Sequence, residues 1–375
     1  MKKIMLSFNY LSILLIGAMA LGCTSSANEN ANNETESVKT TVSIQGDMFY
    51  INGKPTYEGR QWNGHKIEGL LMNARLVQGI FDDENPETVD RWNYPDTQEW
   101  DPDRNTNEFV EAMDEWYAHG LLGFTLNMQG GSPMGYGNKN WRNSAYDEDG
   151  NLKEAYVDRL KKILDKADEL GMVPILGLFY FGQDQYLNDE KAVINAVDNI
   201  MNWLFEKGYK NVLIEVNNEC NVRYDHEILQ PDRVHELILR IKNMKRNGHR
   251  FHVSTSYGGG TIPKPNVVET ADFILIHGNG VNDPNQIMHM VDTIRSMDSY
   301  TEKPIVFNED DHFDFDKEMN NMVAAISKYA SWGYFDFRMD GEGFENGFQS
   351  VPVDWSISSD RKKAFFNKLK EITKG

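Results

Sequence analysis

Two glutamates occupy positions where a pair of carboxyl groups could carry out acid–base chemistry. Glu219 directly follows the run Ile-Glu-Val-Asn-Asn, and Glu309 directly follows Ile-Val-Phe-Asn. When two carboxyl groups face each other, one can donate a proton while the other attacks carbon or activates water. The sequence therefore predicts a reaction carried by Glu219 and Glu309, provided that the fold brings the ends of the two runs together.

These runs belong to a regular alternation of amphipathic helices and apolar strands. We expect strands near residues 123–128, 173–181, 211–216, 251–256, 273–276, 304–307 and 334–337, with helices near 108–118, 156–170, 193–207, 233–245, 287–297, 318–332 and 360–373. Strands that are apolar throughout are typical of a parallel sheet covered on both faces. Residues 56–62 supply an eighth strand, and eight such units favour an α/β fold, the (β/α)8 TIM barrel. No glycine-rich nucleotide motif follows any of these strands.

The segment that precedes this alternation has a different character. Residues 42–54 predict a short N-terminal β-hairpin that could cover one end of the barrel. Apolar residues from Ile67 to Phe81 have helical spacing, and residues 82–105 predict a long polar loop. At the other end of the chain, Ser359 is placed to cap the final helix.

Polar side chains follow most of the predicted strands, at the end where barrel enzymes hold their sites. Amides, hydroxyls and charged groups of this kind suit the hydroxyl groups of a sugar. Tryptophans in predicted loops could stack on sugar faces. The residues that we expect to bind substrate are Arg60, Trp62, Asn127, Gln183, Asn218, Tyr257, His277, Arg338 and Trp355.

The Asn218–Glu219 pair after the fourth strand and Glu309 after the seventh resemble the clan A superfamily of retaining glycoside hydrolases. The resemblance implies that Glu219 is the acid/base, that Glu309 is the nucleophile and that Asn218 contacts the sugar. It implies hydrolysis of a poly- or oligosaccharide without a cofactor. It also implies that ionised Glu309 raises the pKa of Glu219. Many clan members place an arginine near strand two and a tyrosine on strand six. In this chain strand two has no arginine, so Arg60 from strand one is expected to substitute for it, and His277 occupies the position on strand six.

The same residues allow other interpretations. Glu215 is expected to pack inside the barrel, and Cys220 is expected to be a packed thiol. The acidic run 309–316 matches no calcium or zinc spacing, so we expect no metal. A glycan-binding lipoprotein that has lost catalysis and a transglycosylase remain as alternative functions.

The first residues predict export and lipid anchoring. A positive start and a short apolar run end in Ala20-Leu-Gly-Cys23, which resembles a bacterial lipobox. We therefore expect a signal peptide over 1–22, a disordered tether over 23–40 and the barrel domain over 41–375, anchored at the outer membrane or cell surface through Cys23. An ordinary signal peptide with an incidental cysteine is the alternative.

Composition limits the partners and the source of stability. The formal net charge of −19 argues against nucleic acid or anionic lipid as a main partner. With two cysteines, one of them assigned to lipid, no disulfide framework is expected. A hydrophobic share of 40% can supply the core of what we expect to be a monomer.

Overall fold

The computed structural model describes residues 39–136 and 140–374, and the predicted leader, the lipidation residue Cys23 and most of the tether lie outside them. The predicted hairpin is present as β1 (Val42–Gln45) and β2 (Met48–Ile51), which β3 (Lys54–Pro55) extends to an antiparallel sheet. Buried Val42 and Phe49 pack against Leu71, Val173 and other residues that precede or begin the barrel strands. The hairpin therefore covers the N-terminal end of the barrel.

Within the described residues, eight parallel strands surround the core, which confirms the TIM-barrel prediction. They are β6 (Asn73–Arg75), β7 (Gly123–Asn127), β8 (Val173–Tyr180), β9 (Leu213–Asn218), β10 (His252–Ser254), β11 (Ile274–His277), β12 (Ile305–Glu309) and β13 (Gly333–Tyr334). One sheet runs in the order β10-β9-β8-β7-β6-β13, and β11 pairs with β12. Bridges from Val306 to Ser331 and from Asp310 to Tyr334 join β12 to the β13 segment. Between β10 and β11 the ladder is interrupted, and the Asp272 N–H donates to the Val253 carbonyl at 2.9 Å.

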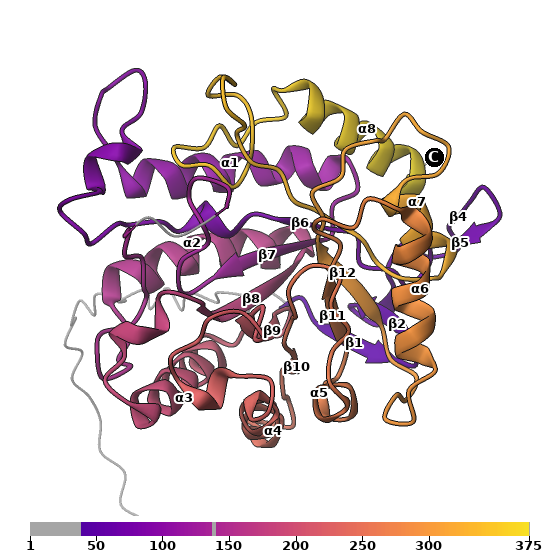
Figure 1. The fold of residues 1–375 in the computed structure, drawn as a ribbon, viewed down its shortest axis with the longest axis horizontal. Coiled ribbons are helices and arrows are strands. Elements are labelled where there is room, and N and C mark those ends of the chain that lie inside the picture. The colour runs from indigo at the N-terminus through magenta and orange to yellow at the C-terminus, as the bar shows by residue number, and fades with distance from the viewer. Residues whose placement is uncertain (1–38, 137–139, 375) are drawn as a thin grey trace, which may run out of the picture. The chain divides into compact units, whose positions relative to one another are not determined.

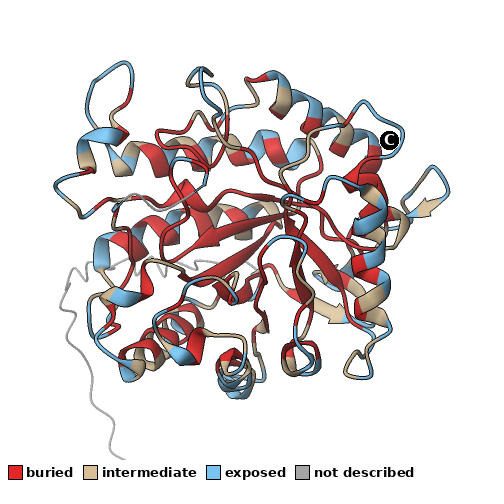
Figure 2. Ribbon diagram, in the orientation of Figure 1, coloured by how far each residue is buried: buried red, intermediate tan, exposed pale blue. Residues whose placement is uncertain are grey.

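Helices cover the outside of these strands (Figure 1). They are α1 (Pro102–Ala118), α2 (Glu154–Leu170), α3 (Glu190–Lys207), α4 (Val234–Asn243), α5 (Pro265–Thr270), α6 (Pro284–Arg295), α7 (Asn321–Ser327) and α8 (Asp360–Thr373). Each buries an inner face against the strands and leaves its outer face to solvent (Figure 2). Ser359 caps α8 as predicted, because its side chain accepts from the Lys362 N–H. No helix in the described part of the chain is long and apolar enough to cross a membrane.

The predicted first strand is wrong. Residues 56–66 form turns and a small hairpin of β4 (Gln61–Trp62) and β5 (His65–Lys66), whereas the first barrel strand is β6. The helix expected between Ile67 and Phe81 is also absent, and this segment instead contains β6 and a 3-10 turn at Val77–Gly79. Residues 70–81 are buried without a break, so their apolar spacing does not distinguish a helix from a strand. The correction places Arg75 at the end of the first strand.

Other deviations are small. Further 3-10 turns occur at Val89–Trp92, Asp184–Tyr186 and Glu227–Leu229. Helix α5 was not predicted, and α7 is shorter than expected because residues 315–319 form turns and bends before it and the helix ends at Ser327.

Candidate active site

Glu219 and Glu309 meet at the mouth formed by the C-terminal ends of the strands. Glu309 is the last residue of β12, and Glu219 is the first residue after β9. Three atoms lie within 4.8 Å of one another: a carboxylate oxygen of Glu219, a carboxylate oxygen of Glu309 and a ring nitrogen of His277. The side chains of Glu219 and Glu309 are 15% and 7% exposed, so the pair is largely removed from water.

The backbone at Glu219 adopts a left-handed conformation with φ of 52°. A non-glycine residue in this region costs on the order of 1–3 kcal/mol, and such strain is concentrated at functional sites. Ser256, just beyond β10, stabilises the turn, because its Oγ accepts from the Glu219 N–H at 2.9 Å and its carbonyl accepts from the Cys220 N–H at 2.9 Å. The strained turn is how Glu219 leaves the line of β9.

Arg75 from β6 supplies a fixed positive charge beneath the two carboxylates. Its Nη1 lies 2.8 Å from Oε2 of Glu309 and donates to Oδ1 of Asn218 at 3.1 Å. Burial by itself would lower the pKa of Arg75, but the charges of Glu309 and other nearby groups outweigh burial and raise it. Arg75 therefore stays charged, and it takes the place that we had expected Arg60 to fill.

His277 at the end of β11 faces both carboxylates. Its Nδ1 lies 3.0 Å from Oε1 of Glu219 and 3.6 Å from Oε2 of Glu309. Burial opposes charge on the ring, but Glu309 and Glu219 outweigh burial, so the pKa of His277 is raised. The ring and Glu219 can therefore share one proton across their hydrogen bond.

The pKa order of the two carboxyl groups is the reverse of the expected one. Burial raises the pKa of Glu309, and Arg75 and His277 offset this only in part. Burial acts on Glu219 in the same direction, but the hydrogen bond and charge of His277 outweigh it and lower the pKa of Glu219. Repulsion between the two carboxylates would raise the pKa of Glu219, but the adjacent His277 has the larger, opposite effect. The proton of the Glu219–His277 pair therefore lies mainly on the ring.

The loop after β12 is anchored by Asp310. Its buried carboxylate accepts from Nε1 of Trp332 at 2.9 Å, from Nδ2 of Asn321 at 3.0 Å and from the ring of His312 at 2.6 Å. A Cβ at Gly278 would lie 2.2 Å from Oδ2 of Asp310, so only glycine permits this close approach of the loops. The anchor fixes the residue next to Glu309.

Three of the predicted site residues are buried in the protein interior. Asn127 and Gln183 are fully buried, and the Gln183 side chain accepts from the Asn143 N–H and donates to the Trp141 carbonyl. Tyr257 is buried beside Cys220. The structure brings Asn218 and His277 to the site, where Asn218 accepts from Arg75 and His277 faces both carboxylates, whereas the hydrogen bonds of Gln183 go to other buried residues.

The predicted roles of Arg60 and Trp62 are wrong, because both residues lie beside the C-terminal helix. Nε of Arg60 donates to the Ile372 carbonyl at 2.8 Å, and Nε1 of Trp62 donates to Oε1 of Glu371 at 2.9 Å. This follows from the misplaced first strand.

The predicted roles of Trp355 and Arg338 also fail on packing. Trp355 is 2% exposed, stacks on Phe348 and donates to Oδ1 of Asn105 at 3.1 Å. The guanidinium of Arg338 donates to the Pro352 carbonyl at 2.7 Å and holds its own loop. Trp355 is therefore part of the hydrophobic core, and Arg338 stabilises the conformation of its own loop.

Two side-chain groups in the described residues could offer three metal ligands each, and both are poor candidates. In the group of Glu219, His277 and Glu309, the Arg75 guanidinium already lies on Glu309 and would repel a cation. In the second group, residues 310–312, the Asp310 oxygens already accept from Trp332 and Asn321.

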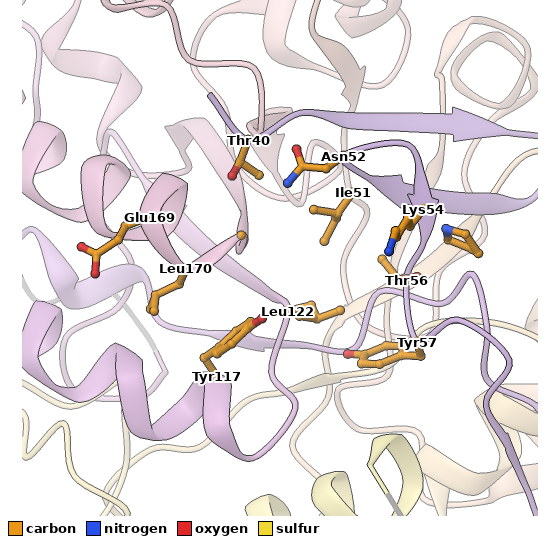
Figure 3. Close-up of a pocket in the computed structure, with 12 residues that line it drawn as sticks. Thr40, Ile51, Asn52, Lys54, Thr56, Tyr57, Tyr117, Leu122, Glu169 and Leu170 are labelled. Carbon is orange, nitrogen blue, oxygen red and sulfur yellow. The ribbon is translucent and has the colours of Figure 1, made fainter. Parts of the chain in front are cut away.

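A separate pocket lies at the opposite end of the barrel (Figure 3). It has a volume of about 310 Å³ and is lined by the hairpin, by Tyr117 at the end of α1 and by the end of α2. None of the carboxylates at the mouth lines it.

Comparison with known proteins supports the fold. No protein-family model matches the sequence, and no curated protein sequence matches it. An endo-1,4-β-mannanase from Rhizomucor miehei is similar in structure, with a TM-score of 0.55 and 11% identity over 89% of this chain and 99% of the mannanase. A glycoside hydrolase family 5 enzyme from Prevotella bryantii is similar with a TM-score of 0.51 and 12% identity, over 80% of this chain and 95% of the Prevotella chain. A broad-specificity endoglucanase from Bacteroides salanitronis is similar with a TM-score of 0.51 and 13% identity, over 81% of this chain and 93% of the endoglucanase. The chain thus has the (β/α)8-barrel fold found in these glycoside hydrolases.

Proposed function

We propose that this protein is a retaining glycoside hydrolase that cleaves a poly- or oligosaccharide. The observation that carries the proposal is the approach of Glu219 and Glu309 oxygens to within 4.8 Å at the barrel mouth. Retaining enzymes hold their two carboxyl groups roughly 5–5.5 Å apart, whereas inverting enzymes leave about 6.5–9.5 Å for a water molecule. The spacing supports direct attack by one carboxylate. The barrel shared with family 5 enzymes supports the same class.

In the proposed first step, ionised Glu309 attacks the anomeric carbon while the leaving oxygen takes a proton from Glu219. Arg75 stabilises the carboxylate of Glu309, and the proton on His277 can pass to Glu219 across 3.0 Å. In the second step, Glu219 takes a proton from water, whose oxygen attacks the anomeric carbon and breaks its bond to the Glu309 carboxylate, which leaves as the free anion. Configuration is retained because the carbon is inverted twice.

A glycan panel tests the proposal. Purified protein lacking residues 1–23 should release new reducing ends from at least one poly- or oligosaccharide, and Glu309→Gln should release none. Binding of the same glycan without cleavage by the wild type would support a non-catalytic glycan-binding protein instead. Products longer than the substrate would identify a transglycosylase.

We also propose that the protein is anchored in the cell envelope through lipid on Cys23. The support is the sequence Ala20-Leu-Gly-Cys23 after an apolar run. Wild-type protein should partition into detergent and incorporate labelled fatty acid, and Cys23→Ser should do neither. A mature N-terminus at any residue other than Cys23 would contradict the anchor.

A further inference from the structure

A chain of hydrogen bonds connects an aromatic side chain at the mouth with Glu309. The hydroxyl of Tyr136 lies 2.6 Å from Oδ2 of Asp311, and Nδ2 of Asn279 lies 3.0 Å from the same hydroxyl. Nδ2 of Asn279 also lies 2.7 Å from Oε1 of Glu309. The four residues come from the loops after β7 and β11 and from β12 with its loop, so the chain exists only in the folded barrel.

The available donors and acceptors permit only one direction of donation along this chain of hydrogen bonds. A phenol has a single hydrogen, and an ionised carboxylate can only accept. Asp311 therefore takes the Tyr136 hydrogen, and the Tyr136 oxygen can only accept from Asn279. The amide must then turn its NH2 group towards Tyr136, which leaves its second N–H for Glu309. Asp311 is itself held by the Gly280 N–H at 3.1 Å.

Packing holds Tyr136 in this position. Its ring makes edge contacts with Phe335 and Phe337, with centroids 5.6 Å and 5.1 Å apart. The preceding Gly135 has φ of 94°, and a Cβ there would lie 2.6 Å from the Phe337 ring. Glycine at this position therefore lets the loop pack directly against the Phe337 ring. Tyr136 is nevertheless 50% exposed, so it stands at the open edge of the site.

We propose that Tyr136 is a positioning residue for Glu309, acting through Asn279. Tyr136 fixes the amide of Asn279 so that an N–H always faces Oε1 of the nucleophile. This inference rests on the proposed function for its kinetic consequences, but the hydrogen-bond chain exists without substrate.

The proposal has a defined consequence for the ionisation of Glu309. The hydrogen bond from Asn279 stabilises the carboxylate and lowers the pKa of Glu309, against the larger effect of burial. Loosening that bond should therefore raise the pKa further. The other charged or titratable groups that act on Glu309 are Arg75 from β6, Tyr180 from β8, Glu215 and Glu219 from β9 and its turn, and His277 from β11.

Tyr136→Phe is the direct test, because it keeps the ring and removes the hydroxyl. The loss of one hydrogen-bond constraint should lower kcat about 5- to 10-fold with KM changed less than about twofold. The acidic limb of the kcat/KM profile should move to higher pH. Tyr117→Phe, on the exposed end of α1 and far from the mouth, is the matched control and should change none of these values.

Asn279→Ala should lower kcat by about 10- to 100-fold, because it removes the donor to the charged carboxylate itself. In that background, Tyr136→Phe should cause no additional loss, since the hydrogen-bond chain is already broken. An equal, additive loss in the double variant would overturn the proposal. So would a Tyr136→Phe enzyme with wild-type kcat and an unchanged pH profile.

A titration without substrate separates this inference from the proposed function. In protein labelled with 13C at glutamate carboxyl groups, the resonance assigned by Glu309→Gln should titrate at higher pH in Tyr136→Phe and higher still in Asn279→Ala. An unmoved titration in both variants contradicts the positioning role. A shifted titration in a protein that cleaves no glycan would leave the positioning role standing and remove the hydrolase proposal.

Discussion

Arg75 lies against Glu309 in the interior of the mouth, with 2.8 Å between Nη1 and Oε2 and with the arginine side chain 1% exposed. The same guanidinium nitrogen donates to Asn218, the residue before Glu219. One cation therefore links the ends of β6, β9 and β12. A buried pair of this kind is costly to break, because removing one partner leaves the other charge uncompensated.

Arg75→Ala should therefore impair both activity and stability. We expect kcat/KM to fall by about 100-fold or more and the free energy of unfolding to fall by about 3–5 kcal/mol. Arg75→Lys should lose less stability because it keeps the charge, yet it should stay well below wild-type activity because it lacks the planar donor group. Kinetics and denaturant unfolding measure the two effects. A wild-type value of kcat/KM in Arg75→Ala would contradict a functional role for Arg75.

The pH profile should be bell-shaped with both limbs displaced upwards. Burial raises the pKa of Glu309, so this proposed nucleophile should become ionised only above the pH at which an ordinary glutamate does. Burial opposes the charged form of His277, but Glu309 and Glu219 outweigh it and raise its pKa, so the proton of the Glu219–His277 pair should persist above the ordinary range of histidine. The measurement is kcat/KM against pH. An acidic limb at or below the ordinary glutamate pKa would contradict the first assignment.

Trp355→Ala should reduce stability without selectively weakening substrate binding. The side chain is buried against Phe348 and other rings, and loss of such a tryptophan costs about 3–5 kcal/mol. KM of the folded fraction should stay close to the wild-type value, in contrast to a residue that stacks on sugar. A large rise in KM with an unchanged melting temperature would restore Trp355 as a binding residue.

The parts of the fold that were predicted correctly have strong local signals. Helix α2 has an apolar face followed by Gly171 in a left-handed cap, and β8 is an apolar run of eight residues buried throughout. Strands β9 and β12 are also buried throughout, so their ends could be located in the same way, and Glu219 and Glu309 with them. Strand β6 has three residues in a segment buried on all sides, so it has no periodicity of its own. That is why Arg75 was missed.

The remaining errors concern contacts that are distant in sequence. Trp355 lies in a loop, and its burial depends on rings from α1 and from the turn at Phe348. The effect of His277 on the pKa of Glu219 depends on a 3.0 Å approach between β11 and the turn after β9. Tyr136 and Asn279 reach Glu309 from loops 173 and 30 residues away, and no sequence pattern marks that convergence.

Azide rescue of Glu309→Ala and Glu219→Ala on an activated aryl glycoside tests the central claim most directly. In Glu309→Ala, azide should occupy the space of the nucleophile and give a glycosyl azide of inverted configuration. In Glu219→Ala, the first step needs no proton for such a leaving group, so azide should intercept the ester and give retained configuration. Opposite stereochemistry in the two variants is the predicted result. The same stereochemistry in both, or full activity without azide in either, would contradict the assignment of Glu309 as nucleophile and Glu219 as acid/base.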